Sequence, residues 1–454
     1  MHDILRAGSL DEFASAAAAH PQITCEAETE PARAAIADTI ACMIAGQSDP
    51  ATQAVLRALP AGTAGLSSVL GHAQKLSAEQ AAMVNGTAAH ALDFDDNFLP
   101  AVTHASAVLV PALLALGEET AATGADLIDA YVIGLEVQAW LGRRMNPDHY
   151  RAGWHATSTI GAIGAAAACA RLLRLGDEPF RNSLSIACSL AGGSKIQFGT
   201  MTKPLHAGLA ARSGILAANL GHAGVEANPD PIFSEWGFIH HHHGHGRTDL
   251  PVPHALSIAL DGLAQKRFPC CGSAHRTLDA IIEIRAREGF AVNDVDRVET
   301  VIPDTNYRNL RFENPQNEKE ARFSMTYCAT LALQYGEVRL ADFTPEAIWR
   351  PELRATMQHI KMREAKKTSS AETDIWNRPA YTCVQLKSGT RFEMNVLNPV
   401  GTISVPFTPE QEVTKFQDCI GSRLSADLLK ELHATLNNLS GQEIRDLMAL
   451  LVPQ

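Results

Sequence analysis

The sequence predicts a mainly α-helical protein with two domains, a large all-helical domain and a smaller α+β domain. The 454 residues exceed what a single hydrophobic core usually covers. From about residue 30 to 260, apolar residues recur at helical spacing almost throughout. After about residue 262, one helix is followed by stretches that alternate as strands do. We expect the helical domain at 1–262, completed by 405–454, and the α+β domain at 263–404.

The helical domain is expected to contain closely packed helices. Its first amphipathic helix ends at Gly46, a residue that commonly stops helices. The next begins at Ser77, which forms a capping-box signature with Gln80. Five more helical segments follow, and Gly, Ala and Ser at their contact positions let helix axes approach closely.

The smaller domain combines a helix with strands. The helix is expected to have Ser273 as its N-cap. A strand follows, in which Val298, Thr300 and Ile302 share one face. Later residues alternate on both sides of a turn at Ser388-Gly389, a pattern that predicts a β-hairpin.

The C-terminal segment, residues 424–451, reads as helical again and is expected to return to the first domain. Its last helix carries a capping-box signature formed by Ser440 and Glu443. Leu439 and Ile444 are placed as the matching hydrophobic staple.

The composition excludes several classes of protein. A net charge of -12 offers no basic stripe for phosphates, so no nucleic-acid partner is expected. Charged residues make up 19%, below the usual quarter, which indicates much buried helix and an oligomer. No uncharged apolar run reaches the ~18 residues of a membrane helix, and no targeting segment is visible. Nine scattered cysteines without a CxxC motif indicate reduced thiols, so we expect a cytoplasmic protein.

Four ionisable side chains stand at the expected starts of helices: His104, His155, Lys203 and His275. A helix start presents free N–H groups and the positive end of the dipole, so it attracts carboxylates and favours neutral histidine and lysine. A partly desolvated lysine can act there as a base near neutral pH. If these helix starts converge, they form a carboxylate site that also exchanges protons. The alternative is that each histidine only caps its own helix.

The segment HALDFDD at 90–96 is the second candidate group. Asp93 and Asp96 would share one face of a helix. Such carboxylates could orient a histidine, accept a proton or bind a metal, and an N-cap with a solvated charge is an equally open alternative. No metal is expected, because the chain lacks HExxH, an EF-hand loop and cysteine pairs at zinc spacing.

Two other features are expected to be structural. The histidines His240–His243 and His245 lie in a Gly-rich stretch, and we interpret them as part of a surface loop. Cys270 and Cys271 precede a helix start, where a thiol pKa can be lowered, but buried packing is the preferred interpretation. No phosphate-binding glycine motif and no nucleophile elbow is present.

Five blocks, taken in order, resemble the MmgE/PrpD family. They are NGTAAHALDFDD, GWHATSTIGAIGAAAACARLLRL, TKPLHAGLAARSGILAANLGHAG, KRFPCCGSAHRTLDA and ARFSMTYCATLAL, and the resemblance spans roughly residues 30 to 400. It implies a large all-helical domain, a smaller α+β lid domain, a homodimer, and an active site between the domains without an organic cofactor. The family includes 2-methylcitrate dehydratase, cis-aconitate decarboxylase and iminodisuccinate epimerase.

The family's pocket carries over to seven positions: Asp93, His104, His155, Lys203, Lys266, His275 and Tyr327. The resemblance alone supplies Lys266 and Tyr327. His155 and Lys203 are the expected proton-transfer residues.

The other positions receive supporting roles. Tyr327 and His275 are expected to act from the lid domain, and Asp93 to orient a histidine. His104, Lys266 and Asn97 are expected to bind substrate. Tyr150, five residues before His155, is a further candidate for binding or proton donation.

Departures from the family pattern bear on the reaction. Asn97 stands where the decarboxylase and dehydratase branches usually have Thr. Asn97-Phe98 also replaces the Thr-Trp pair of the 2-methylcitrate dehydratases, and KRFPCCGSAH differs from their segment. We therefore favour epimerisation of an iminodisuccinate-like dicarboxylate by acid–base chemistry. A lyase acting on a citrate-like or aconitate-like acid is the first alternative, and a non-catalytic helical binding protein is the second.

Overall fold

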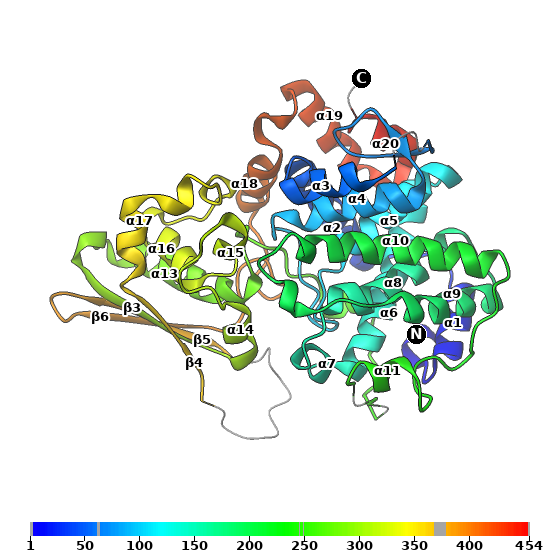
Figure 1. Ribbon diagram of the computed structural model, residues 1–454, viewed down its shortest axis with the longest axis horizontal. Coiled ribbons are helices and arrows are strands. Elements are labelled where there is room, and N and C mark those ends of the chain that lie inside the picture. The colour runs from blue at the N-terminus through cyan, green and yellow to red at the C-terminus, as the bar shows by residue number, and fades with distance from the viewer. Residues whose placement is uncertain (1–2, 61–63, 245, 248, 367–377, 453–454) are drawn as a thin grey trace. The chain divides into compact units, whose positions relative to one another are not determined.

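A computed structural model describes residues 3–60, 64–244, 246–247, 249–366 and 378–452. The chain is mainly helical, as the sequence predicts. It divides into two compact units (Figure 1). Unit 1 comprises Met1–Ile196, Thr202–Ala264 and Cys419–Gln454, and unit 2 comprises Gln197–Met201 and Gln265–Asp418.

Unit 1 is built from helices, with one short hairpin of β1 (Ser67–Ser68) and β2 (Lys75–Leu76). The helices are α1 (Leu10–Ala19), α2 (Glu26–Gly46), α3 (Pro50–Ala58), α4 (Ala78–Ala91), α5 (Ser106–Thr120), α6 (Gly124–Met145), α7 (Asp148–Arg151), α8 (Ala156–Leu172), α9 (Asp177–Leu190), α10 (Thr202–His222), α11 (Phe238–His241), α12 (Ser257–Leu260), α19 (Ala426–Asn437) and α20 (Ile444–Ala449). Helix α10 is central, because α4, α8 and α9 all pack against it. Over the described ranges, no helix combines the length and the hydropathy needed to cross a bilayer.

Small residues bring α10 close to its neighbours, as the sequence predicts. A Cβ atom on Gly208 would lie 2.1 Å from the carbonyl oxygen of Met83 in α4. A Cβ on Gly214 would lie 2.3 Å from the Cβ of Ala165 in α8. Only glycine fits such contacts, so α10 is locked against both helices.

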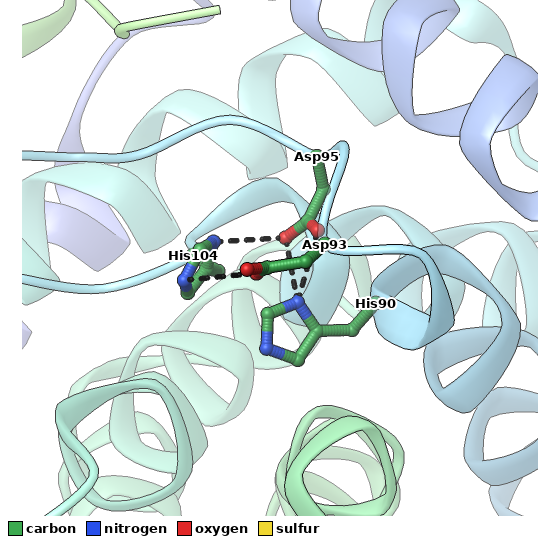
Figure 2. A group of neighbouring side chains, drawn as sticks. All are labelled: His90, Asp93, Asp95 and His104. Atoms are coloured by element: carbon green, nitrogen blue, oxygen red, sulfur yellow. Dashed lines mark hydrogen bonds and ion pairs between the residues drawn. The ribbon is translucent and has the colours of Figure 1, made fainter. Parts of the chain in front are cut away.

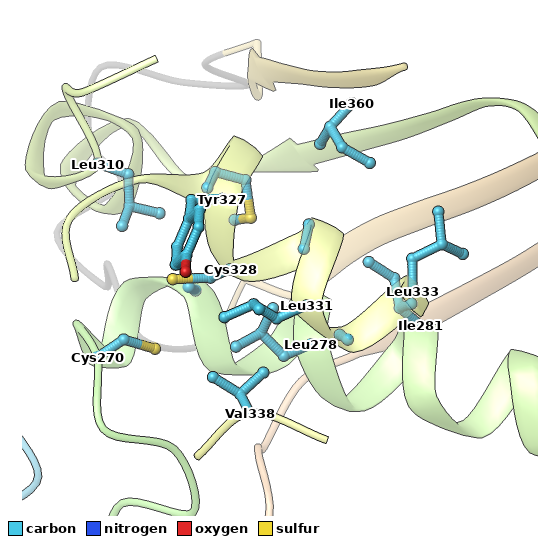
Figure 3. Close-up of a cluster of buried hydrophobic side chains, with 14 of the residues drawn as sticks. Cys270, Leu278, Ile281, Leu310, Tyr327, Cys328, Leu331, Leu333, Val338 and Ile360 are labelled. Carbon is cyan, nitrogen blue, oxygen red and sulfur yellow. The ribbon is translucent and has the colours of Figure 1, made fainter. Parts of the chain in front are cut away.

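Unit 2 contains a four-stranded sheet in the order β4-β3-β5-β6. β3 (Val295–Ile302) runs parallel to β4 (Ile360–Glu364) and antiparallel to β5 (Ala380–Leu386), which pairs with β6 (Arg391–Val396). Helix α13 (Gly272–Glu288) packs on β5 and β6, and α16 (Met325–Tyr335) packs on β4 and α13. The remaining helices are α14 (Asp304–Asn309), α15 (Glu318–Ala321), α17 (Pro351–Met357) and α18 (Pro409–Ile420). The core lies where α13 and α16 meet the sheet (Figure 3).

The strand predictions are confirmed, whereas two cap predictions are wrong. Val298, Thr300 and Ile302 are the buried face of β3, and β5 and β6 form the predicted hairpin. Helix α13 starts one residue before Ser273, so Cys271 is its N-cap. Ser440 belongs to a short 3-10 turn, and the last helix starts at Ile444 with Glu443 as an N-cap that makes no side-chain bond.

Candidate active site

The loop after α4 carries three buried carboxylates. Helix α4 ends at Ala91, and the backbone of Asp93 turns into the left-handed region with φ 53°. The prediction that Asp93 and Asp96 share a helix face is therefore wrong. The turn points Asp93 toward Lys203 and Asp96 toward Ser106. Asp95 is also buried.

Asp93 forms an ion pair with Lys203 of α10. The Nζ atom lies 2.7 Å from Asp93 Oδ1, and both side chains are less than a twentieth exposed. Lys203 is the second residue of α10, one position inside the helix rather than ahead of it. The tight crossing of α10 over α4 brings this ammonium group to the loop after α4.

Two histidines face Asp95. His90 Nδ1 lies 2.9 Å from both Asp95 oxygens, and His104 Nδ1 lies 3.1 Å from Asp95 Oδ2 (Figure 2). Burial lowers the pKa of His90 to about 3 against the pull of Asp95. Burial alone would raise the pKa of Asp95, but His90 and His104 hold it well below its usual range. A neutral His90 thus donates to an ionised Asp95.

His104 connects this group to Asp93. Its Nε2 atom lies 4.0 Å from Asp93 Oδ1, and its Nδ1 atom lies 2.9 Å from the carbonyl oxygen of Asp96. A bond to a carbonyl requires a proton on Nδ1. His104 is therefore held mainly by Asp95 and by the backbone, and the prediction that Asp93 orients a histidine stays a prediction.

The four side chains His90, Asp93, Asp95 and His104 could each offer a metal ligand, with the ligand atoms within 4.8 Å of one another. Lys203 already donates to Asp93, and both histidines already bond to Asp95. A cation would have to displace these contacts. We interpret the group as a hydrogen-bonded charge network, and the prediction of no metal stays a prediction.

Asp96 belongs to a separate buried network. Ser106 Oγ bonds to Asp96 Oδ2, and the Tyr131 hydroxyl lies 2.7 Å from the same Oγ atom. Burial raises the pKa of Asp96 to about 7, although the bonds from Ser106 oppose the shift. Near neutral pH this carboxyl group can keep its proton, and protonated it serves as a donor.

His155 is the N-cap residue of α8, yet its side chain makes no capping bond. The capping alternative is therefore wrong for this residue. Its Nδ1 atom lies 3.0 Å from Nδ1 of His206 in α10. Burial, followed by Lys203, lowers the pKa of His155 well below its usual range and the pKa of His206 to about 4. Both rings are neutral at pH 7.

Two further predicted residues of unit 1 have contacts of their own. The ring of Tyr150 lies 3.5 Å from Lys195 Nζ, a cation–π contact. Asn97 pairs with Ala264 through its backbone, in an isolated antiparallel bridge. Their proposed substrate contacts stay predictions.

The predicted residues of unit 2 are buried there. The Tyr327 hydroxyl donates to the carbonyl of Asp342, and burial raises its pKa. His275 Nε2 lies 3.2 Å from the carbonyl oxygen of Cys270, and Lys266 is 1% exposed. Their catalytic and binding roles stay predictions.

The cysteine pair and the histidine run have structural surroundings. Cys270 and Cys271 are buried, as the packing interpretation expects. The histidine run is not simply a surface loop, because its first part forms helix α11 and His242 packs against Phe238 and Trp154. His245 lies outside the described residues.

Sequence reasoning missed His90, Asp95, His206, Ser106 and Tyr131. Two signals were available. His90 and Asp95 lie within the HALDFDD segment, and His206 stands three residues after Lys203, hence on the same helix face.

Comparison with known proteins agrees with the five sequence blocks. A model of the MmgE/PrpD N-terminal domain matches residues 11–250, and a model of the C-terminal domain matches residues 268–438. Human cis-aconitate decarboxylase is 32% identical over 383 residues, which are 81% of this chain and 78% of that protein. The mouse protein of that name is 30% identical over 385 residues, 81% of this chain and 77% of the relative. A cis-aconitate decarboxylase of Aspergillus terreus is 25% identical over 436 residues, 89% and 87% of the two chains.

Proposed function

The chain belongs to the MmgE/PrpD family of enzymes, and we propose that it is a lyase that decarboxylates a small unsaturated tricarboxylate of the cis-aconitate type. The observation that carries the proposal is the likeness to cis-aconitate decarboxylases across about four fifths of both chains. The three relatives described above are named as decarboxylases and not as epimerases, so the comparisons do not support the epimerase reading of the sequence. The lyase alternative replaces it.

Decarboxylation sets three requirements for a site. The C–C bond to the leaving carboxylate breaks, CO₂ departs, and the electron pair stays on the substrate. The remaining carboxylates must be held while this charge develops. One proton must then reach the carbon that carries the electron pair, so each turnover consumes one proton.

The buried cluster of unit 1 has the chemistry for these tasks. Lys203 brings an ammonium group next to the start of α10, where a substrate carboxylate can replace or share Asp93 as its partner. His104 and His155 are imidazoles within 6.5 Å of each other, measured between ring centroids, and both can carry a proton to carbon. Asp95 fixes the orientation of His104 and of His90.

The test is to incubate the purified protein with cis-aconitate, 2-methylcitrate and iminodisuccinate in heavy water and to follow each acid by proton NMR. We expect loss of CO₂ from cis-aconitate and one deuterium on a carbon of the product. If an alkene forms with loss of water and without release of CO₂, the proposal of decarboxylation is wrong and the enzyme is a dehydratase. If deuterium enters the α-carbon without loss of water or CO₂, the result would support the epimerase hypothesis instead.

Two variants separate an enzyme from a binding protein of the same fold. His155→Gln should lower turnover about 10²–10⁴-fold while the protein stays folded. His72→Gln is the matched control, because His72 is a half-buried histidine that bonds to Gln53 outside the cluster. Its turnover should equal that of the wild type. No turnover of any acid by the wild type would contradict the proposal.

A homodimer remains part of the proposal, since it follows from the family resemblance and from the low share of charged residues. Light scattering coupled to size-exclusion chromatography should give twice the chain mass of 48.7 kDa. A mass of one chain would contradict it.

A further inference from the structure

The pair formed by His155 and His206 has a property that neither ring has alone. Their Nδ1 atoms are 3.0 Å apart, within hydrogen-bond distance. A ring nitrogen either carries a hydrogen and donates, or is bare and accepts. One Nδ1 atom must therefore be protonated and the other bare.

The two rings must hold opposite tautomers. Each ring is neutral near pH 7, so each carries one N–H group. If His155 is protonated on Nδ1, its Nε2 is bare and His206 has its hydrogen on Nε2. If His206 is protonated on Nδ1, the reverse holds. The state of one ring thus fixes whether the other presents an acid or a base at Nε2.

Two locked helices hold the pair together. His155 is the N-cap of α8, and His206 stands on α10 one turn after Lys203. The contact of Gly214 with Ala165 fixes α10 against α8. Both side chains are buried, with exposures of 1% for His155 and 5% for His206. The hydrogen bond therefore joins two rings whose backbones cannot move apart easily.

We propose that His206 is a positioning residue for proton transfer by His155: it fixes the orientation of that imidazole and couples the protonation of its Nε2 atom to a second ring. The inference rests on the function proposed above. With Nδ1 engaged, Nε2 of His155 faces away from His206, on the opposite side of the ring.

The proton transfer through the pair balances without a lasting charge. When His155 gives the Nε2 proton to the substrate carbon, its Nδ1 atom takes the proton of His206 Nδ1, and His206 Nε2 takes one from water. The hydroxide left by that water combines with the released CO₂ to form bicarbonate, so charge and atoms balance. The pair ends neutral, with its tautomers exchanged. After product release, the reverse exchange with water restores the first state.

The first experiment needs no substrate. Histidine labelled with ¹⁵N is introduced into the whole protein, and a two-bond ¹⁵N–¹H spectrum reports the tautomer of each neutral ring. Signals among the 18 histidines are assigned with His155→Gln and His206→Leu. His149 is an internal reference, because its Nδ1 lies 2.8 Å from the carbonyl oxygen of His242 and must be protonated.

We expect His155 and His206 to show opposite tautomers, and His206→Leu to change the nitrogen shifts of His155 but not those of His149. Equal tautomers for the two rings would overturn the inference, because two N–H groups or two bare nitrogens cannot bond. Unchanged shifts of His155 in His206→Leu would overturn it as well.

The second experiment measures kinetics. His206→Leu should lower kcat about tenfold or more with KM nearly unchanged, since substrate binding is left to other groups. His206→Asn keeps a group that donates or accepts and should recover part of kcat. The kcat–pH profile should shift in His206→Leu, while Lys203, His90 and His104, the other charged or titratable groups facing His155, stay in place.

The outcomes separate this inference from the proposed function. Opposite tautomers together with full kcat in His206→Leu would overturn the positioning role and leave the decarboxylase proposal intact. Opposite tautomers in a protein that turns over no acid would overturn both, because no proton transfer would remain to be positioned. A pure folding role for His206 predicts parallel loss in Leu and Asn variants and an unshifted pH profile, which would also overturn it.

Discussion

In unit 1 the candidate site residues hold one another, with Lys203 on Asp93 and His155 on His206, whereas in unit 2 Tyr327 and His275 are each held by a backbone carbonyl. In a network of side chains, each member leaves a buried partner unsatisfied when it is removed. Removing the Tyr327 hydroxyl, in contrast, takes a donor from the carbonyl of Asp342 and from no buried charge that it bonds. The same family resemblance thus points to two sets of residues that should respond very differently to substitution.

The largest effect is expected for Lys203→Met, which leaves Asp93 buried without its ammonium partner. Breaking a buried ion pair of this kind costs about 3–5 kcal/mol of unfolding free energy. Loss of the carboxylate-binding ammonium should also lower kcat/KM about a thousandfold. Urea denaturation and turnover of cis-aconitate measure the two effects.

Lys75→Met is the matched control for that variant, because Lys75 also pairs with a carboxylate, that of Glu118, but is itself half exposed. It should change stability by less than about 1 kcal/mol. The double variant Lys203→Met/Asp93→Asn should recover part of the stability without activity. A stable Lys203→Met protein would show that the ion pair contributes little to unit 1.

A smaller effect is expected from Asp96→Asn, and it depends on pH. Folded Asp96 has a pKa of about 7 against an ordinary 3.8. The raised pKa contributes stability that is fully present below pH 3.8 and is lost as the pH rises through about 7. Relative to wild type, Asp96→Asn should therefore gain stability between pH 4 and pH 8, by at most about 4 kcal/mol. Equal pH slopes for both proteins in thermal unfolding would mean that Asp96 is ionised in the fold.

A still smaller change in stability is expected when a tyrosine hydroxyl is removed, and each unit offers one such variant. Tyr327→Phe removes the donor to the carbonyl of Asp342, and Tyr131→Phe removes one of the partners of Ser106, whose other partner is Asp96. Each should lower stability by about 1–2 kcal/mol. The comparison predicts that Tyr327→Phe loses less activity than His155→Gln. An equal loss would break it, and would assign the Tyr327 hydroxyl to the reaction as the family resemblance predicts.

The smallest effect is expected from removing metal ions. His90 and His104 both bond to Asp95 through Nδ1, so a cation bound through these atoms would compete with those hydrogen bonds. Dialysis against EDTA should change turnover by less than about twofold, and added zinc should not raise it. If EDTA abolished activity and one metal restored it, the interpretation of this group as a charge network would be wrong and the group would be a metal site.

The sequence predicts most of the fold through period and turn chemistry. The face of β3 and the turn at Ser388-Gly389 follow from alternation and from glycine, which are local properties. The caps at Ser273 and Ser440 failed because several nearby residues can start a helix, and packing chooses among them. Local patterns therefore locate elements better than they locate ends.

The sequence predicted several residues of the candidate site, but it did not predict which of them contact one another. His104, His155 and Lys203 do stand at helix starts, which the sequence indicates. The bond between His155 and His206 depends on how α10 lies on α8, which no local pattern encodes. The left-handed turn at Asp93 likewise gives Asp93 and Asp96 different partners, Lys203 and Ser106, which a helical interpretation of that segment could not show.

Because Gly208 has no side chain, α10 can approach α4 closely, and this approach sets the distance between Lys203 and Asp93. Its α-carbon touches α4 so closely that a single methyl group would meet the carbonyl of Met83 at 2.1 Å. Gly208→Ala would leave every ionisable group of the site in the sequence, yet it would wedge α10 away from the loop that holds Asp93. A residue with no functional group thus sets the spacing of the ionisable groups in the site. A mutational scan restricted to polar residues would overlook it.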